Sequence, residues 1–248
     1  MKDAELQASW DDKAAAWNDW VGTDGDRNRQ VNSDPVLHRL LGSPEGLDIL
    51  DAGCGTGYLS VKLAAAGGRV VGVDLSPAMI AHARDNAASA GVSVRFLAQS
   101  LAALTRLPDA SFDRAVSNYV LMDLPDLEGA MVELARVLRP GGFAVLVFLH
   151  PCFGPPGGPE RLDDGSVRYR WPWPYLEQRR FEESWGPFNS AFIAFHRPLS
   201  AYFAAITQAG LTVAELHEPA GEDTTGLTPE QIRGVRMTPF SVVLKVLR

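Results

Sequence analysis

Short apolar runs alternate with amphipathic segments along the first 150 residues of the chain. The runs are nearly continuous, which is typical of strands that helices cover on both faces. We expect strands within residues 47–52, 69–76, 92–99, 111–122 and 143–150. We expect helices at 3–20, 34–42, 57–66, 76–91 and 126–142. This alternation predicts an α/β fold with a doubly wound, mostly parallel sheet.

The alternation stops near residue 150 and resumes near residue 198. A helix at 198–210 and strands at 211–218 and 239–248 complete the pattern, with a polar linker between the two strands. The stretch 150–197 is rich in Pro, Gly, Trp, Phe and Tyr and keeps no helical period. Within it, SVRYRW and FNSAFIAF could pair as an antiparallel hairpin.

Length and composition fit one globular domain with a substantial core. The chain has 248 residues, of which 46% are hydrophobic and 21% are charged, and its formal net charge is −7. The negative charge argues against a nucleic-acid partner and against an anionic membrane surface. The longest apolar run is far shorter than the roughly 20 residues that a membrane-spanning helix needs.

The first residues are polar and acidic, unlike a signal peptide. The two cysteines, Cys54 and Cys152, lie far apart and lack the spacing of metal ligands. We therefore expect free thiols, no metal site and a cytoplasmic protein.

The first predicted strand runs into DAGCGTG at residues 51–57, where three glycines stand at every second position. A glycine turn between a strand and a helix is where a doubly wound sheet binds nucleotide-like ligands. Glycine reaches positive φ and lets a ligand lie against the backbone. The spacing differs from that of the phosphate loop, and Tyr58 stands where the dinucleotide motif has its third glycine. We therefore expect a ligand other than a pyrophosphate.

Asp74 ends the second predicted strand, about 20 residues beyond the glycines. A carboxylate at this position can accept hydrogen bonds from both hydroxyls of a ribose. Adenosyl and NAD ligands share a ribose, so Asp74 alone leaves both of them open.

Four segments, in order, resemble the class I S-adenosylmethionine-dependent methyltransferases of the small-molecule type. They are LDILDAGCGTG, VVGVDLS, FDRAVSNYVLMDLPD and LRPGGFAVLVF. The domain they indicate is similar to the families called methyltransferase domain 11 and methyltransferase domain 25. The resemblance covers residues 45–150 well and the last helix and strands weakly. It implies a seven-stranded Rossmann-like sheet that ends in an antiparallel strand, with S-adenosyl-L-methionine as the cofactor.

The same resemblance implies roles for individual residues. Residues 51–57 would wrap the methionine part of the cofactor, Asp74 would hold the ribose, and Asn118 would lie near the ammonium group. Residues 99–101 would flank the adenine, although many members have an acidic residue where this chain has Gln99 and Ser100. The cofactor-binding residues implied are Asp51, Gly53, Cys54, Gly55, Gly57, Asp74, Leu75, Gln99, Ser100, Leu101, Asn118, Tyr119, Trp20 and Arg29.

We expect the chain to be divided into a cap, a cofactor-binding domain and a lid. Residues 1–44, which contain Trp17, Trp20 and Arg29, would form an N-terminal helical cap over the cofactor. Residues 45–149 and 198–248 would form the cofactor-binding domain. Residues 150–197, rich in aromatic side chains, would form a substrate lid; the core of a subdomain or a dimer interface are the alternatives.

The candidate catalytic residues are Asp123, His150 and His196, which lie where the fourth and fifth strands end and before the last helix. A general base is needed only if the accepting atom still carries a proton at neutral pH. Each residue also has a structural interpretation. Asp123 could be a helix N-cap, His150 a buried structural histidine, and His196 a cap of the helix at Pro198.

The predicted function is methyl transfer, by in-line displacement, to a small and hydrophobic or aromatic molecule. The alternatives are a methyltransferase of a protein or RNA target, an NAD-dependent oxidoreductase, and a cofactor-binding protein without catalysis. A homodimer through the aromatic segment is also possible. The accepting atom is left open.

Overall fold

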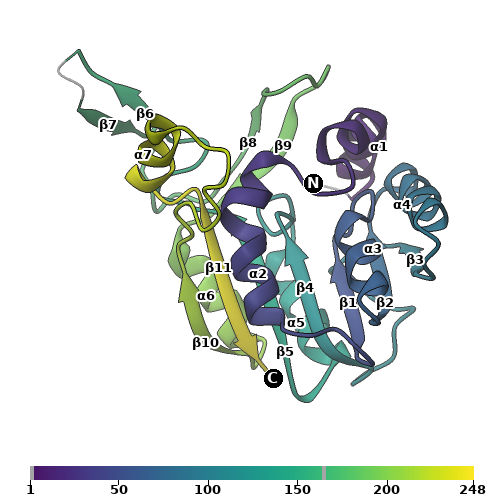
Figure 1. Cartoon of the computed structure of the whole chain (residues 1–248). Helices are drawn as coiled ribbons and strands as arrows, with labels where there is room; N and C mark the ends of the chain where they lie inside the picture. The colour runs from purple at the N-terminus through teal and green to yellow at the C-terminus, as the bar shows by residue number, and fades with distance from the viewer. Residues whose placement is uncertain (1–2, 164–165) are drawn as a thin grey trace.

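Seven strands form the central sheet of the computed structural model, which describes residues 3–163 and 166–248, and helices cover both faces (Figure 1). The strand order is β10-β11-β5-β4-β1-β2-β3. The strands are β1 (Asp48–Ala52), β2 (Arg69–Asp74), β3 (Arg95–Ala98), β4 (Phe112–Asn118), β5 (Leu138–Leu149), β10 (Thr212–His217) and β11 (Ser241–Leu247). Only β11 runs against its neighbours, and the other strands of this sheet are parallel. The predicted α/β class and the antiparallel last strand are confirmed.

The helices lie close to their predicted positions. They are α1 (Asp3–Val21), α2 (Asp34–Leu41), α3 (Tyr58–Ala65), α4 (Pro77–Ser89), α5 (Leu127–Val137), α6 (Leu199–Gln208) and α7 (Pro229–Met237). Ser76 caps α4 as its sequence suggests, because its side chain accepts a hydrogen bond from the backbone N–H of Met79 and Pro77 follows at the first helical position.

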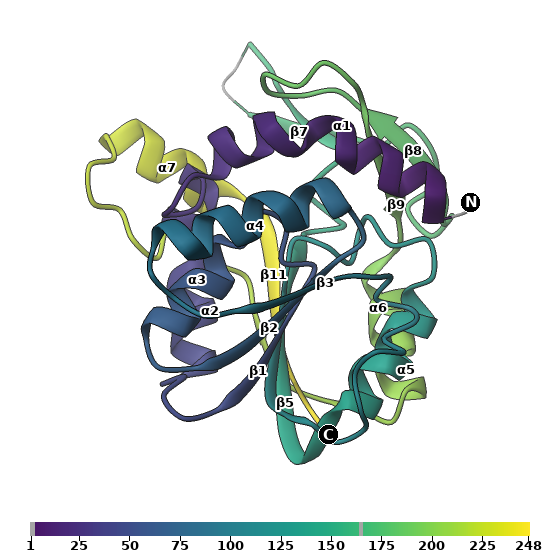
Figure 2. The ribbon, with the colours of Figure 1, turned by 90° about the vertical axis from the view of Figure 1, so that its right-hand side faces the viewer.

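The core is divided between the two faces of the sheet. On one face, α2 and α3 pack against apolar side chains such as Ile49, Val116 and Val145. On the other face, α5 and α6 pack against Leu50, Leu146 and their neighbours (Figure 2). The strands are therefore buried on both sides, which explains why their sequences are continuous apolar runs.

The carboxyl ends of the parallel strands share one edge of the sheet, and α1 and the segment 150–197 lie above that edge (Figures 1 and 2). The helix α1 runs alongside α4. A ligand of a doubly wound sheet binds at this edge. Among the described residues, no helix is long and apolar enough to cross a bilayer.

The predicted hairpin within the aromatic segment is wrong. SVRYRW contains β7 (Val167–Arg170), which pairs with β6 (Gly158–Arg161). FNSAFIAF contains most of β9 (Phe192–His196), which pairs with β8 (Arg179–Glu183). The sequence RRFEE of β8 carries one apolar side chain among four charges, so it gives no strand signal, and β9 organises it through pairing.

Two further elements lie where the sequence predicts loops. A π-helix, η1 (Arg29–Ser33), precedes α2, and α7 lies in the linker before β11. The helix α7 has a capping box of Thr228 and Gln231 but no buried residue. Its few apolar side chains, among them Ile232 and Val235, are only partly buried, and its sequence otherwise resembles a polar loop.

Candidate functional site

The glycine turn after β1 places backbone where side chains would not fit. Gly53, Gly55 and Gly57 all have positive φ, at +85°, +52° and +83°. A Cβ at Gly53 would lie 2.3 Å from Cγ2 of Val120, and one at Gly57 would lie 2.9 Å from Cβ of Ala83. A Cβ at Gly55 would meet only Trp17, at 3.6 Å or more. Gly53 and Gly57 thus permit close packing, whereas a Cβ at Gly55 would make only ordinary contact with Trp17.

Two carboxyl groups hold this turn, the buried Asp51 and the half-buried Asp74. The carboxylate of Asp74 accepts a hydrogen bond from the N–H of Gly55 at 2.9 Å and another from the N–H of Ser76 at 2.9 Å. Asp51 accepts a hydrogen bond from the hydroxyl of Ser60 at 2.6 Å. Burial raises the pKa of Asp74, and burial together with the nearby Asp74 raises the pKa of Asp51 to about 7. Each oxygen of Asp74 keeps a second acceptor site, which suits the hydroxyls of a ribose.

The end of β4 contributes Asn118 and Tyr119. The side-chain N–H of Asn118 donates to the hydroxyl of Tyr58 at 2.6 Å, but its buried oxygen has no partner among the described residues. Tyr119 has φ +59°, which is uncommon for a residue other than glycine. Its hydroxyl is hydrogen-bonded to Ser241 and accepts from Asn28 at 2.7 Å. The fixed Asn118 oxygen is an acceptor that a ligand ammonium or N–H group would satisfy.

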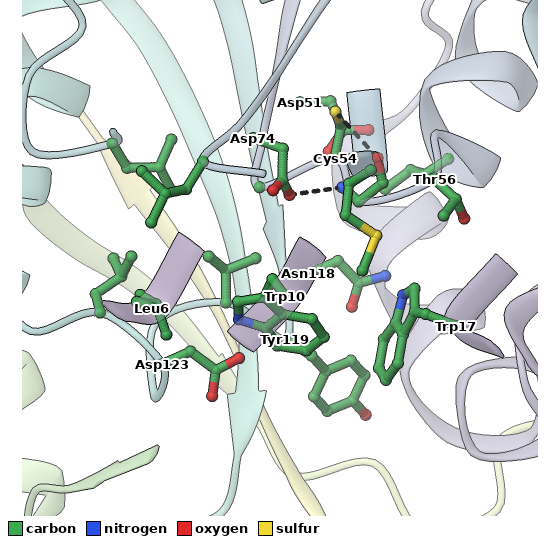
Figure 3. A pocket seen from close by; sticks show the side chains of 18 of the residues that line it. Leu6, Trp10, Trp17, Asp51, Cys54, Thr56, Asp74, Asn118, Tyr119 and Asp123 are labelled. Carbon is green, nitrogen blue, oxygen red and sulfur yellow. Dashed lines mark hydrogen bonds between the residues drawn. The ribbon is translucent and has the colours of Figure 1, made fainter. Parts of the chain in front are cut away.

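These residues line a cavity with about 890 Å³ of empty space, shown in Figure 3. Side chains of Trp10 and Trp17 reach into it from α1. Of the predicted cofactor-binding residues, those that line this cavity are Asp51, Gly53, Cys54, Gly55, Asp74, Leu75, Ser100, Leu101, Asn118, Tyr119 and Arg29. Gly57, Gln99 and Trp20 do not line it. Gly57 packs on α4, and both side-chain polar atoms of Gln99 are buried without a partner in the described structure.

A second cavity, with about 1350 Å³ of empty space, adjoins the first. The two share Trp10, Trp17, Arg29, Tyr119 and Asp123 as lining residues. Aromatic side chains form much of the second lining: Trp20, Phe181, Trp185, Phe192, Phe195, Tyr202 and Phe240. They come from α1, the β8–β9 hairpin, α6 and the segment before β11. Trp185 and Phe192 stack with ring centroids 4.6 Å apart.

Two of the three predicted catalytic candidates, Asp123 and His196, line these cavities. Asp123 lines both cavities and is not a helix cap, since Asp126 caps α5. His196 lines the second cavity, and its Nε2 is hydrogen-bonded to the main-chain oxygen of Tyr175 at 2.7 Å. Because a carbonyl only accepts, Nε2 carries a proton.

His150 lies outside the linings of both cavities. Its Nδ1 accepts from the N–H of Cys152 at 3.1 Å, and its Nε2 is 2.8 Å from the carboxylate of Glu218. Both ring nitrogens are therefore engaged in contacts within the chain, and the catalytic role of His150 stays a prediction. Both cysteines are free thiols, as predicted. Within the described part of the chain, no three His, Cys, Asp or Glu side chains are grouped to hold a metal ion.

The sequence does not single out Leu6, Trp10 or Glu183 as site residues, yet each lines a cavity. Trp10 lies seven positions before Trp17, about two helical turns, and therefore on the same face of one helix. This spacing could have indicated that Trp10 lies beside Trp17 at the site. Glu183 lies in a charged strand without a motif, and only the fold brings it to the cavity.

A comparison with known proteins agrees with this site. Residues 50–146 match the family model described as a methyltransferase domain. A ubiquinone biosynthesis O-methyltransferase of Xanthomonas axonopodis is 32% identical over 139 residues, which cover 55% of this chain and 58% of that protein. A demethylmenaquinone methyltransferase of Thermus thermophilus is 42% identical over 112 residues, or 44% of this chain and 49% of that protein. The chain thus spans about half the length of the curated relatives it matches.

Solved structures extend the similarity to almost the whole chain. The crystal structure of an S-adenosylmethionine-dependent methyltransferase from Mesorhizobium loti has a TM-score of 0.75 and 26% identity, and the match covers 92% of this chain and 100% of that one. The groups around the first cavity fit the cofactor. Asp74 can accept hydrogen bonds from a ribose, the unpartnered Asn118 oxygen can accept one from an ammonium group, and Gly55 has no Cβ to keep a ligand from its backbone. Residues 50–146 thus match a methyltransferase domain, and the fold of almost the whole chain is similar to that of an S-adenosylmethionine-dependent methyltransferase.

Proposed function

We propose that the protein transfers a methyl group from S-adenosylmethionine to a small, hydrophobic or aromatic molecule that binds in the second cavity. The observation that supports this most is the shared wall between the two cavities, formed by Trp10, Trp17, Arg29, Tyr119 and Asp123. A donor in one cavity and an acceptor in the other would meet at that wall. Relatives include a methyltransferase of ubiquinone biosynthesis and a demethylmenaquinone methyltransferase, which is compatible with an aromatic acceptor.

The bound cofactor supplies a methyl group on a positively charged sulfur, already activated for displacement. The task of the chain is to orient the two reactants, an effect worth up to roughly 7–11 kcal/mol in favourable systems. Asp74, the Gly55 backbone and Asn118 would hold the cofactor. Trp10 and Trp17 would exclude water from the reacting atoms.

The segments keep their predicted roles within this proposal. Residues 1–44 act as a cap on the cofactor, residues 45–149 and 198–248 as the cofactor-binding domain, and residues 150–197 as the lid over the acceptor. Asp123 is the candidate general base because it lines both cavities, and His196 is a second candidate from the acceptor side. A cytoplasmic location, a possible homodimer and the absence of nucleic-acid partners remain predictions.

Methyl transfer is tested with isotopically labelled S-adenosylmethionine and a panel of phenols, quinols and aromatic amines, with products identified by mass spectrometry. Labelling of protein and RNA fractions in parallel tests the two macromolecular alternatives. Calorimetry with S-adenosylhomocysteine and with NAD separates the methyltransferase from an oxidoreductase. Absence of heat with S-adenosylhomocysteine would contradict the proposal.

A variant that fills the second cavity tests where the acceptor binds. Ala194 lines only that cavity, so Ala194→Phe should lower kcat/KM for the acceptor by about tenfold or more while the affinity for S-adenosylhomocysteine stays unchanged. Ala88→Phe on the exposed face of α4 is the matched control and should alter neither quantity. Equal activity of A194F and the natural protein would place the acceptor elsewhere.

A further inference from the structure

Two carboxyl groups face the second cavity from different elements. Asp123 lies in the turn after β4 and is buried, and Glu183 ends β8 and is half-buried. Among the described residues, neither side chain has a hydrogen-bond or ion-pair partner. Two carboxyl groups that line one aromatic cavity and keep free acceptor positions are sites for a ligand that carries donors.

The other charged groups around the cavity have partners of their own. Arg29 is paired with Asp26. Arg197 donates to main-chain oxygens, at 2.6 Å for Leu124 and 3.3 Å for Pro125. The lining has three carboxyl groups against two guanidinium groups, and the charge of Arg197 acts on Asp123, so an excess of one negative charge remains when all of these groups are ionised.

The aromatic rings of the cavity favour positive charge. The ammonium group of Lys13 lies 5.2 Å from the ring centroid of Phe192, and the guanidinium of Arg29 lies 5.5 Å from that of Trp17. Both rings line the second cavity. Ring faces attract cations through their quadrupole, and more strongly where water is excluded.

We propose that Asp123 and Glu183 together bind a basic amine on the acceptor, so that the preferred acceptors are aromatic or hydrophobic amines. This inference rests on the proposed function, in which the second cavity holds the acceptor. Burial raises the pKa of both carboxyl groups, and Glu183 adds to the shift at Asp123 by repulsion. A bound ammonium group relieves that repulsion. A neutral group such as an alcohol would not relieve it, and equal binding of an amine and its alcohol is the competing outcome of the test.

The test measures binding rather than turnover, so it does not depend on finding the true acceptor. The probes are matched pairs that differ in one group: tryptamine and tryptophol, phenethylamine and 2-phenylethanol, and 1-naphthylmethylamine and 1-naphthalenemethanol. Each is titrated by calorimetry into protein saturated with S-adenosylhomocysteine at pH 7.5. We expect at least one amine to bind about tenfold or more tightly than its alcohol.

Variants assign the preference to the two residues. Asp123→Asn and Glu183→Gln should each weaken amine binding by about ten- to a hundredfold and leave alcohol binding within twofold. Glu182→Gln is the matched control, because Glu182 neighbours Glu183 on β8 but is exposed and pairs with Arg180 at 2.7 Å. Should D123N fail to fold, as judged by circular dichroism, E183Q on the outer hairpin carries the test alone.

Two results would overturn the inference: no amine of the panel preferred over its alcohol, or variants that weaken both members of a pair equally. Loss of S-adenosylhomocysteine binding would instead contradict the proposed function. The two failures are therefore distinguishable.

Discussion

Lys13 of α1 donates a hydrogen bond to the hydroxyl of Ser190 in the turn between β8 and β9, with 2.7 Å between the two atoms. The same hydroxyl donates to Asp12 at 2.7 Å, and Arg180 of β8 donates to Glu5 of α1 at 2.9 Å. The helix α1, which lines both cavities, and the β8–β9 hairpin, which lines the second, are thus joined. Opening one of them to release a ligand strains or breaks the contacts to the other.

We expect Ser190→Ala to speed the release of S-adenosylhomocysteine. The variant removes both hydrogen bonds, while Lys13 keeps its bonds to Ser9 at 3.0 and 3.1 Å, so the fold should lose no more than about 1–2 kcal/mol. A release rate about two- to tenfold higher is expected in stopped-flow fluorescence, with Trp17 and Trp185 close enough to report the opening. Ser184→Ala, at an exposed position between the strands, is the control. Unchanged release in S190A would show that α1 and the hairpin move independently.

Gly53 should tolerate no side chain. Gly53→Ala must adopt positive φ and places a methyl group 2.3 Å from Val120. The left-handed conformation alone costs about 1–2 kcal/mol, and the overlap adds about 1–3 kcal/mol. Gly46→Ala isolates the first effect, because Gly46 has φ +70° with no atom in contact range of the added Cβ. Urea unfolding of both variants should show the larger loss for G53A, and equal losses would mean that Val120 moves aside freely.

Asp74→Asn should weaken cofactor binding more than its small change in shape suggests. The amide has one acceptor oxygen where the carboxylate has two, so its NH₂ group must face the N–H of Gly55 or of Ser76. The turn would lose a charge-assisted bond, and the ribose would lose an ionised acceptor. We expect the affinity for S-adenosylhomocysteine to fall about ten- to a hundredfold in calorimetry. Asp85→Asn, exposed on α4, should leave that affinity unchanged, and the same result for D74N would exclude a role of Asp74 in binding.

The sheet and its cofactor edge could be predicted from the sequence because both follow from local patterns. Strands buried on two faces are continuous apolar runs, as in β1 and β5, and the glycine turn and Asp74 have fixed places relative to such strands. The small strand β8 and the helix α7 have no such pattern. The strand β8 forms by pairing with β9, and the helix α7 begins at its capping box.

The second cavity could not be derived from the sequence for a different reason. Its wall combines α1, the β8–β9 hairpin, α6 and the segment before β11, which are distant in the chain. Glu183 meets Asp123 only because the hairpin folds back over the end of β4. The orientation of His150 could not be read from the sequence either: it follows a core strand, as a catalytic residue would, and its ring lies against Glu218.

Replacement of His150 should therefore affect stability more than chemistry. His150→Ala leaves the N–H of Cys152 and the carboxylate of Glu218 without their partner, which should cost about 1–3 kcal/mol in unfolding experiments. The affinity for S-adenosylhomocysteine and the kcat for an identified acceptor should change by no more than about threefold, because the ring contacts neither cavity. A folded H150A variant with kcat reduced a hundredfold would restore His150 as a catalytic candidate.

Asp51 should make the stability of the ligand-free protein depend on pH. Its pKa is about 7 in the folded state, whereas an unfolded aspartate has a pKa of about 3.9. Between these values the folded state keeps a proton that the unfolded state has released, so the contribution of Asp51 to the free energy of unfolding falls as the pH rises from about 4 to 7 and is constant above that range.

At about 1.4 kcal/mol per pH unit, the full change is roughly 4 kcal/mol. Asp51→Asn can still accept the hydrogen bond of Ser60 but cannot ionise. The free energy of unfolding of D51N minus that of the natural protein should therefore increase between pH 4.5 and 7.5 in urea titrations. The effect of other titrating groups cancels in this difference. A constant difference would mean that the Asp51 carboxyl group is already ionised at pH 4.5 and that its burial is compensated within the glycine turn.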